Sequence, residues 1–437
     1  MYHSLRAFLS AKQTSDKKFL LILILLAVFL RLVWILVLEV EPVSDFSKYF
    51  RLATSLSQGL GYVASDGTPT AYFPVGYPAF LALFFSLFGS SLLLAKFLNV
   101  LLSAGTIAVF YVFSRDLIEK TEVRRWAAVL IAFFPSQVAY ASLISDSILF
   151  QLLLYFGLWV MVKPIWYRAF LGGVVLGLST LTRPYGLLIP LIAGLFLWPK
   201  VRTSVKFRSM VIAYFAVALV ISPWIIRNYR IFNNFVLISN NGGINLLIGN
   251  GPGTTGRYAD EPLASLNAQQ LNEFETDQKA RKIAVRSILN NPIRFLGLGM
   301  LKTIYLYAED AQALRWNLKG MPGRGGMEIR YGITDFIAMG FFQAYYCVVF
   351  LAFLFYFVRV YVARKPIEKV RLGGLWIIIY FTSIAFVFFA SPRFHFPVIP
   401  ILALYAGAAF DFLSPVERGA PARVSKKNPG DSLHELG

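Results

Sequence analysis

Long apolar stretches, separated by short runs of lysine and arginine, recur along the whole chain. The first, residues 19–38, is about 20 residues long, which as a helix matches the hydrocarbon thickness of a bilayer. It follows a basic start but has no small-residue cleavage site after it, so we expect a retained span and not a signal peptide. Further stretches of plausible spanning length lie at residues 90–114, 126–143, 147–162, 169–182, 185–198, 209–226, 335–358, 372–390 and 396–413.

The composition of the chain supports a membrane protein. Hydrophobic residues make up 57% of the 437 residues, charged residues 15%, and the mean hydropathy is +0.61, which excludes an ordinary soluble enzyme. The sequence therefore predicts an all-α integral membrane protein, a polytopic helix bundle of about ten spans with loops at its outer face. The single cysteine, Cys347, permits no intramolecular disulfide, and only three histidines are present, which limits metal chemistry.

The net charge of +19 indicates membrane lipids, and not nucleic acid, as the partner of the basic residues, because these gather in short runs between apolar stretches. The runs at residues 114–125, 199–208 and 359–371 are expected in the cytoplasm together with both termini. Two shorter apolar pieces, residues 74–88 and 292–307, are then interfacial or re-entrant helices, since crossing by both would turn all three basic runs outward. Two real short spans remain the alternative.

This topology divides the chain into four parts. An N-terminal transmembrane core includes a first outer loop, a second outer segment contains a helix expected at 271–289, C-terminal spans follow, and a Pro-, Gly- and charge-rich tail is expected to be disordered in the cytoplasm. The N-terminal core is residues 1–226, with the first outer loop at 39–89. The outer segment is residues 227–334, the C-terminal spans lie within 335–413, and the tail is 414–437.

The first outer loop begins with a helix-like pattern that carries an acid and a cation on one face. Asp45, Lys48, Tyr49 and Leu52 stand at i, i+3, i+4 and i+7, at the expected outer boundary of the membrane. One interpretation is that Asp45 is a catalytic base and that Lys48 is a cation beside it. The alternative is a capping aspartate with cations that snorkel to the interface.

Several motifs are spread along nearly the whole chain. They are Gly59-Leu-Gly-Tyr62, Tyr72-Phe-Pro-Val-Gly-Tyr-Pro78, Leu181-Thr-Arg-Pro184, Pro223-Trp-Ile-Ile-Arg-Asn-Tyr229, the run 238–250, which ends in Gly249-Asn250, and Ser391-Pro-Arg-Phe-His-Phe-Pro397. These motifs resemble those of the GT-C glycosyltransferases, in particular the bacterial family that includes protein O-mannosyltransferases and lipid A aminoarabinose transferases, glycosyltransferase family 39-like proteins. One departure is that many relatives have Asp-Glu where this chain has Asp45-Phe46.

The resemblance implies an inverting transfer of a sugar from a polyprenyl-phosphate donor to an extracytoplasmic acceptor, which is a lipid, a glycan or a protein. Such a reaction needs a base near the membrane surface and cations for the leaving phosphate. Asp45 is expected to be the base. Asp146, at a tight outer turn, is the candidate second acid, with a solvated helix cap as its alternative. The candidate phosphate-binding cations are Lys48, Arg51, Arg183, Arg227 and Arg393, with Tyr49 and His395 as further possible site residues.

Several points stay open at the level of sequence. No organic cofactor is expected, and a divalent metal is possible, although Phe46 and a single outer histidine make its ligand set thin. His395 is either a phosphate donor, a metal ligand or a satisfied interfacial histidine. An O-antigen ligase or polymerase is an alternative enzyme, which the acidic first loop argues against. A lipid-linked sugar flippase is an alternative from another class, but it would predict internal symmetry, which we do not find. The expected location is the cell membrane.

Overall fold

The computed structural model describes residues 2–198, 201–259, 263, 266, 271–324, 326–362 and 369–413, and the predicted disordered tail lies outside them. Within this part of the chain the fold is helical, and its only β pairings are two isolated bridges. The prediction of an all-α fold is confirmed. The helices are α1 (Tyr2–Val37), α2 (Asp45–Ser57), α3 (Gly76–Phe88), α4 (Leu92–Leu117), α5 (Thr121–Ala132), α6 (Pro135–Ala139), η1 (Tyr140–Ser142), α7 (Ser147–Met161), α8 (Trp166–Thr182), η2 (Pro184–Leu188), α9 (Ile189–Phe196), α10 (Thr203–Phe232), α11 (Gly242–Asn250), α13 (Glu273–Asn290), α14 (Pro292–Tyr307), α15 (Gln312–Gly320), η3 (Gly326–Glu328), α16 (Ile333–Val362), α17 (Lys369–Val387), η4 (Pro392–Val398) and α18 (Ile399–Leu413).

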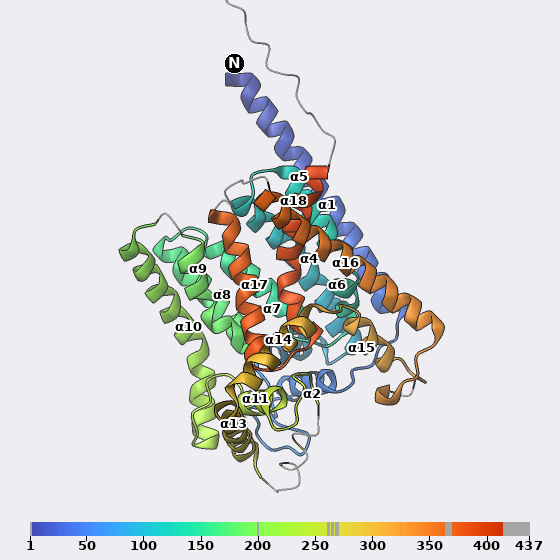
Figure 1. Ribbon diagram of the computed structural model, residues 1–437, viewed down its shortest axis with the longest axis vertical. Coiled ribbons are helices and arrows are strands. Elements are labelled where there is room, and N and C mark those ends of the chain that lie inside the picture. Colours follow the sequence, from blue (N-terminus) through green and yellow to red (C-terminus); the bar gives the residue numbers. More distant parts are fainter. Residues whose placement is uncertain are drawn as a thin grey trace, which may run out of the picture.

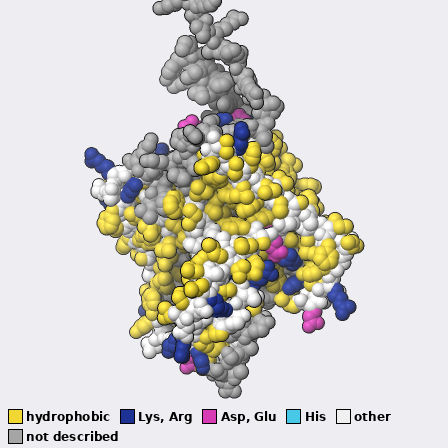
Figure 2. All heavy atoms as spheres, viewed as in Figure 1, with side chains coloured by type: hydrophobic (Ala, Val, Ile, Leu, Met, Phe, Trp, Pro, Cys, Tyr) yellow, Lys and Arg dark blue, Asp and Glu magenta, His cyan; other side chains and the backbone are white. Residues whose placement is uncertain are grey.

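The helices are apolar on their outer surfaces as well as on their packed faces. On α1, Leu23 and Ala27 are buried, whereas Leu25 is 59% and Phe29 66% exposed. Hydrophobic side chains cover most of the middle of the face seen in Figure 2, and charged side chains gather toward its ends and its right edge. A helix that is apolar all round suits a lipid surround, which offers no water to its outer face.

The number of spans differs from the predicted ten. Five helices are long and apolar enough to cross a membrane, and a sixth is counted if the bent pair Pro135–Ser142 and Ser147–Met161 is one span. Other predicted spans correspond to shorter helices, such as α8. The predicted interfacial pieces 74–88 and 292–307 form α3 and α14, which also fall outside this set of long apolar helices. The prediction of ten spans is therefore not confirmed.

The predicted continuous helix 126–143 is wrong, because the chain breaks within it. Helix α5 ends at Ala132, Phe134 is extended, and the chain then turns by 120° between the short helices before Ser142 and α7. The cause is Pro135, which has no N–H to continue the helix and disfavours the helical conformation of the residue before it.

Buried polar side chains stabilise this break. Arg31 of α1 is fully buried, and its guanidinium donates to the Ala132 carbonyl at 2.8 Å and to the Ser103 hydroxyl at 2.7 Å. The Asn99 amide of α4 donates to the Leu143 carbonyl at 2.8 Å. These bonds satisfy carbonyls that the broken helix leaves without an intrahelical partner.

The two ends of the bundle differ in what they carry. Asp16 of α1 forms ion pairs with Arg115, Arg124 and Arg125 at the end where α5 and α18 lie, at the top of Figure 1. Helices α2, α11 and α13 lie at the opposite end. The predicted cytoplasmic run 114–125 and the first outer loop are thus at opposite ends, as the predicted topology requires.

The segment after α10 folds into a small helical layer at the lower end. The predicted helix 271–289 is confirmed as α13, and Asn272 begins it with a capping box. Helix α11 packs against α13 and against residues 388–389, with its backbone very close to both. A Cβ atom on Gly249 would lie 1.7 Å from the Phe388 carbonyl oxygen, so only glycine fits there.

We predict that Gly249→Ala destabilises the protein by about 3 kcal/mol or more, because the clash is with backbone and no side chain can move away. The matched control is Gly297→Ala in α14, where a Cβ has no atom within 4 Å. Thermal unfolding of the purified protein in detergent measures both. Equal unfolding temperatures for the two variants would contradict the packing of α11 described above.

Candidate functional site

A cavity of about 310 Å³ lies at the end of the bundle that carries α2 and α11. Its walls come from α2, the loop at residues 72–74, the start of α7, the junction of α8 and η2, the stretch 237–248 and residues 388–394. Segments far apart in the sequence therefore meet here. Apart from tyrosines, the charged and polar side chains that line it are Asp45, Lys48, Ser145, Asp146, Arg183, Ser239, Asn241, Asn245 and Arg393.

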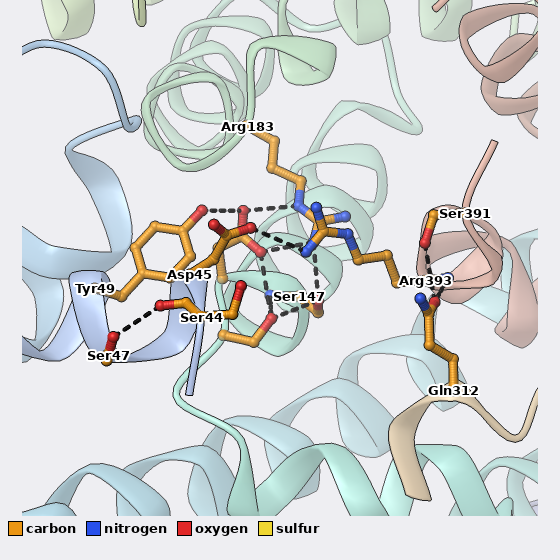
Figure 3. A network of polar contacts seen from close by, with 11 residues as sticks. Ser44, Asp45, Ser47, Tyr49, Ser147, Arg183, Gln312, Ser391 and Arg393 are labelled. Atoms are coloured by element: carbon orange, nitrogen blue, oxygen red, sulfur yellow. Dashed lines mark hydrogen bonds and ion pairs between the residues drawn. The ribbon is translucent and has the colours of Figure 1, made fainter. Parts of the chain in front are cut away.

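The most buried charges in the cavity are Asp146 and Arg183, which form a two-point ion pair. Arg183 Nε lies 2.9 Å from Asp146 Oδ2, and Nη2 lies 2.6 Å from Oδ1 (Figure 3). Their side chains are only 8% and 10% exposed. Burial alone would lower the pKa of Arg183, but the charge of Asp146 and its hydrogen bonds raise that pKa above its ordinary value. Arg183 is therefore a permanent cation.

Arg183 also keeps one unused donor. Its Nη1 atom is buried and has no hydrogen-bond partner in the described part of the chain. Its Nη2 atom additionally donates to the Ser147 hydroxyl at 2.8 Å. A buried guanidinium donor without a partner is costly unless a ligand satisfies it. Arg183 thus lines the cavity while one of its buried donors is left unsatisfied by the described residues.

A second ion pair, between Asp45 and Arg393, is looser than the first. One contact of 3.4 Å joins Asp45 Oδ2 to Arg393 Nη1, and the side chains are 33% and 26% exposed. Gln312 holds the Arg393 backbone N–H at 2.8 Å (Figure 3). Ser44, just before Asp45, has a φ of 54°, a strained value for a residue with a side chain. Because its one contact with Arg393 is long, Asp45 can still accept hydrogen bonds, whereas both oxygens of Asp146 already accept from Arg183.

Lys48 and Tyr49 complete the predicted face of α2 in the cavity. The Lys48 ammonium lies 5.5 Å from the centre of the Phe73 ring. The Tyr49 hydroxyl donates to Asp146 Oδ2 at 3.4 Å. Burial, and then the charges of Asp146 and Asp45, raise the pKa of Tyr49 well above its usual value. The phenol therefore stays protonated and acts as a donor.

Three predicted site residues do not line the cavity. Arg51 is exposed on α2. Arg227 donates to the carbonyls of Thr70 and Tyr62 at 2.9 Å each, so it fastens the first outer loop.

His395 is the third of these residues and is fully buried. Its Nδ1 donates to the Leu306 carbonyl at 2.6 Å, because a carbonyl can only accept, and its Nε2 lies 2.8 Å from Asp310 Oδ1. These contacts agree with the alternative of a satisfied histidine.

The sequence analysis missed the amides of the opposite wall. Asn241 and Asn245 line the cavity from the end of the 237–248 stretch, and Gln312 supports Arg393 from behind. The run 238–250 was noted only as a shared motif. Its two asparagines, four residues apart at the start of a helix, were the signal that could have indicated a polar face.

The cavity does not offer a ready site for a divalent cation. Such ions take several oxygen ligands at once. In the part of the chain that the structure describes, two carboxylates line the cavity, and each already has a guanidinium partner. Among the described residues no group of three or more His, Cys, Asp or Glu side chains is placed to hold a metal. We therefore derive no chemical step through a metal.

The overall fold is similar to that of solved oligosaccharyltransferase structures. One is the archaeal oligosaccharyltransferase AglB from Archaeoglobus fulgidus in complex with an inhibitory peptide and a dolichol-phosphate, with a TM-score of 0.56 at 14% identity. Another is the Archaeoglobus fulgidus oligosaccharyltransferase tethered to an acceptor peptide containing the NVT sequon, with a TM-score of 0.52 at 16% identity.

Both matches cover 92% of this chain and 50% of the other, so the chain spans about half the length of these enzymes. At such low identity the likeness shows the fold alone. No model of a protein family and no curated protein sequence matches the chain. The prediction of a glycosyltransferase-like membrane fold from the sequence motifs thus agrees with the fold of these solved structures.

We predict that Arg183→Met destabilises the protein by about 3–5 kcal/mol, because it leaves the Asp146 carboxylate buried without a cation. Adding Asp146→Asn to that variant removes the unpaired charge and should recover part of the loss. Thermal unfolding in detergent compares the single and the double variant. A single variant as stable as the double one would show that Asp146 is not a buried charge.

Proposed function

We propose that the chain is an integral membrane glycosyltransferase that moves a sugar from a polyprenyl-phosphate carrier to an extracytoplasmic acceptor, with inversion at the anomeric carbon. The observation that carries this proposal is the cavity itself. It gathers three cations and two carboxylates, a net charge of +1, beside aromatic and aliphatic side chains. An anionic phosphate joined to an apolar chain is complementary to such a surface.

The solved neighbour with a similar fold supports a lipid-linked donor. That enzyme was observed with a dolichol-phosphate and a peptide. A polyprenyl phosphate keeps its phosphate at the membrane boundary, and the cavity lies at one end of an apolar bundle. The predicted topology puts this end outside the cytoplasm, because the basic run 114–125 lies at the other end.

Asp45 is better suited than Asp146 to act as the general base. Both oxygens of Asp146 are occupied by Arg183 at 2.6 and 2.9 Å. Asp45 has one contact of 3.4 Å and is one third exposed, so a carboxylate oxygen is left to accept a proton. Asp146 then acts indirectly, by orienting Arg183 and Tyr49. A Glu after Asp45, as in many relatives, is not needed in this arrangement.

The proposed reaction is a single displacement at the anomeric carbon. Asp45 accepts the proton of the acceptor hydroxyl, whose oxygen forms a bond to the anomeric carbon. The bond from that carbon to the phosphate oxygen breaks on the opposite face. Arg183, Arg393 and Lys48 stabilise the phosphate that leaves with the electron pair. A charged hydrogen bond of this type is worth about 1.5–3 kcal/mol.

We predict that Asp45→Asn lowers turnover by a factor on the order of 10²–10⁴, because the amide keeps the shape but does not accept the proton. Donor binding should persist. The measurement is transfer from a polyprenyl-phosphate sugar in membranes, with Asp146→Asn as the comparison, which should cost less. Near wild-type turnover of Asp45→Asn would reject Asp45 as the base.

The role of the cations is tested by two variants on one helix. Lys48→Ala should weaken donor binding by roughly one to two decades, because Lys48 lines the cavity. Arg51→Ala is the matched control, since Arg51 is exposed outside it. Donor affinity is measured with the purified protein in lipid nanodiscs. An equal loss in both variants would place the phosphate elsewhere on α2.

A further inference from the structure

The cavity described above has two chemically different walls. All of its charged side chains come from α2, the start of α7, the α8–η2 junction and η4. The wall formed by residues 237–248 contributes the polar residues Ser239, Asn241 and Asn245, and it carries no charge. Phosphate chemistry is thus confined to one side of the cavity, and the other side offers amide and hydroxyl groups.

The asparagine side chains on this wall do not cap the helix on which they stand. Asn241 stands at the N-cap of α11, where an asparagine side chain usually accepts from the first N–H groups of its helix. It makes no such bond, because Asp277 of α13 takes those groups: its Oδ1 accepts from Gly243 at 2.6 Å and from Ile244 at 3.2 Å. The cap of α11 is therefore supplied from another helix.

The amide of Asn241 is left facing the cavity with a defined orientation. The Ser239 hydroxyl donates to Asn241 Oδ1 at 3.1 Å, which leaves Nδ2 as a free donor. The Asn245 amide, one turn further along α11, has no protein partner among the described residues. Two amide groups on one helix face, of which the described residues engage only Asn241 Oδ1, are suited to donate to and accept from the hydroxyl groups of a ligand.

Aromatic rings adjoin these amides. Tyr72, Tyr258 and Phe389 line the same cavity, and the rings of Tyr258 and Phe389 lie 5.9 Å apart. Apolar ring faces pack against the C–H face of a sugar, while the amides bind its hydroxyls. A volume of about 310 Å³ lies at the small end of the range for ligand pockets, which favours one sugar ring over a chain of them.

The charge balance of the cavity restricts the sugar further. The charged side chains that line it among the described residues sum to +1, and a polyprenyl-phosphate sugar carries one negative charge on its phosphodiester. A neutral sugar makes the occupied cavity neutral. An amino sugar or a uronic acid would leave one charge without a partner against the amide wall, which is unfavourable in a buried setting.

From these observations we infer that Asn241 and Asn245 select a single neutral sugar, bound through its hydroxyl groups, and discriminate against sugars that carry an amino or a carboxyl group. This inference rests on the proposed function, because it assigns the sugar subsite of the same cavity. The two asparagines are specificity-determining residues. They act on the sugar, and the cations of the opposite wall act on the phosphate.

The test measures donor binding, so that no acceptor has to be assumed. Purified protein in nanodiscs is titrated with four polyprenyl-phosphate donors, which carry mannose, glucose, 4-amino-4-deoxyarabinose or galacturonic acid, and with polyprenyl phosphate alone. We expect at least one neutral donor to bind roughly tenfold more tightly than either charged one. Tightest binding of a charged donor would overturn the inference and leave the proposed function standing.

Variants connect the preference to the amide wall. Asn241→Ala and Asn245→Ala should each lose roughly tenfold in affinity for the neutral donor and nothing for polyprenyl phosphate alone. Asn245→Asp should shift the preference toward the aminoarabinose donor. The matched control is Asn234→Ala, an exposed residue whose amide binds only the Phe232 carbonyl.

Two outcomes would contradict the inference, one from the variants and one from the donor titration. Unchanged neutral-donor affinity in both alanine variants would overturn the assignment of the sugar subsite. If polyprenyl phosphate and all four donors fail to bind, the proposed function fails and the inference fails with it.

Discussion

The site depends on one constraint, which is that a charge buried in an apolar bundle needs an opposite charge beside it. Asp146 at the start of α7 and Arg183 at the end of α8 meet this need for each other, and Tyr49 of α2 adds its hydroxyl to the same carboxylate. Arg393 then joins η4 to Asp45 of α2. Charge pairing therefore fixes the relative positions of elements that are distant in sequence, and it does so at the cavity proposed to bind the donor phosphate.

The two ion pairs differ in their burial and in the length and number of their contacts. The tight pair is buried, has a hydrogen bond to each carboxylate oxygen and keeps one guanidinium donor unused. The loose pair has one long contact and is open to the cavity. A tightly paired carboxylate is a poor proton acceptor but a good anchor, whereas a weakly paired one stays reactive. In the proposed function, the tight pair orients the site and the loose pair supplies the proton acceptor.

The sequence predicted much of the site, because its motifs carry residue types that the chemistry needs. Asp45, Asp146, Arg183 and Arg393 do meet in one cavity, but their pairing could not be predicted, since it depends on how α2, α7, α8 and η4 pack. The break between α5 and α6 was missed because a proline inside an apolar stretch is ambiguous: Pro223 lies within the continuous helix α10, whereas Pro135 follows the end of a helix. The role of Asn241 was hidden for a similar reason, because its capping function is taken by Asp277, far along the chain.

The buried guanidinium of Arg31 has a consequence for how the protein is made. Its two partners outside α1, the Ser103 hydroxyl and the Ala132 carbonyl, lie in segments that are synthesised later. An arginine near the centre of a single inserted helix costs about 2.5–3.5 kcal/mol on the insertion scale, and only the apolar remainder of α1 offsets that cost at first. The first helix therefore enters the bilayer incompletely satisfied and becomes fully stable only after α4 and α5 pack against it. We therefore expect the N-terminal helix to be inserted first and to gain its polar contacts only when α4 and α5 have been inserted beside it.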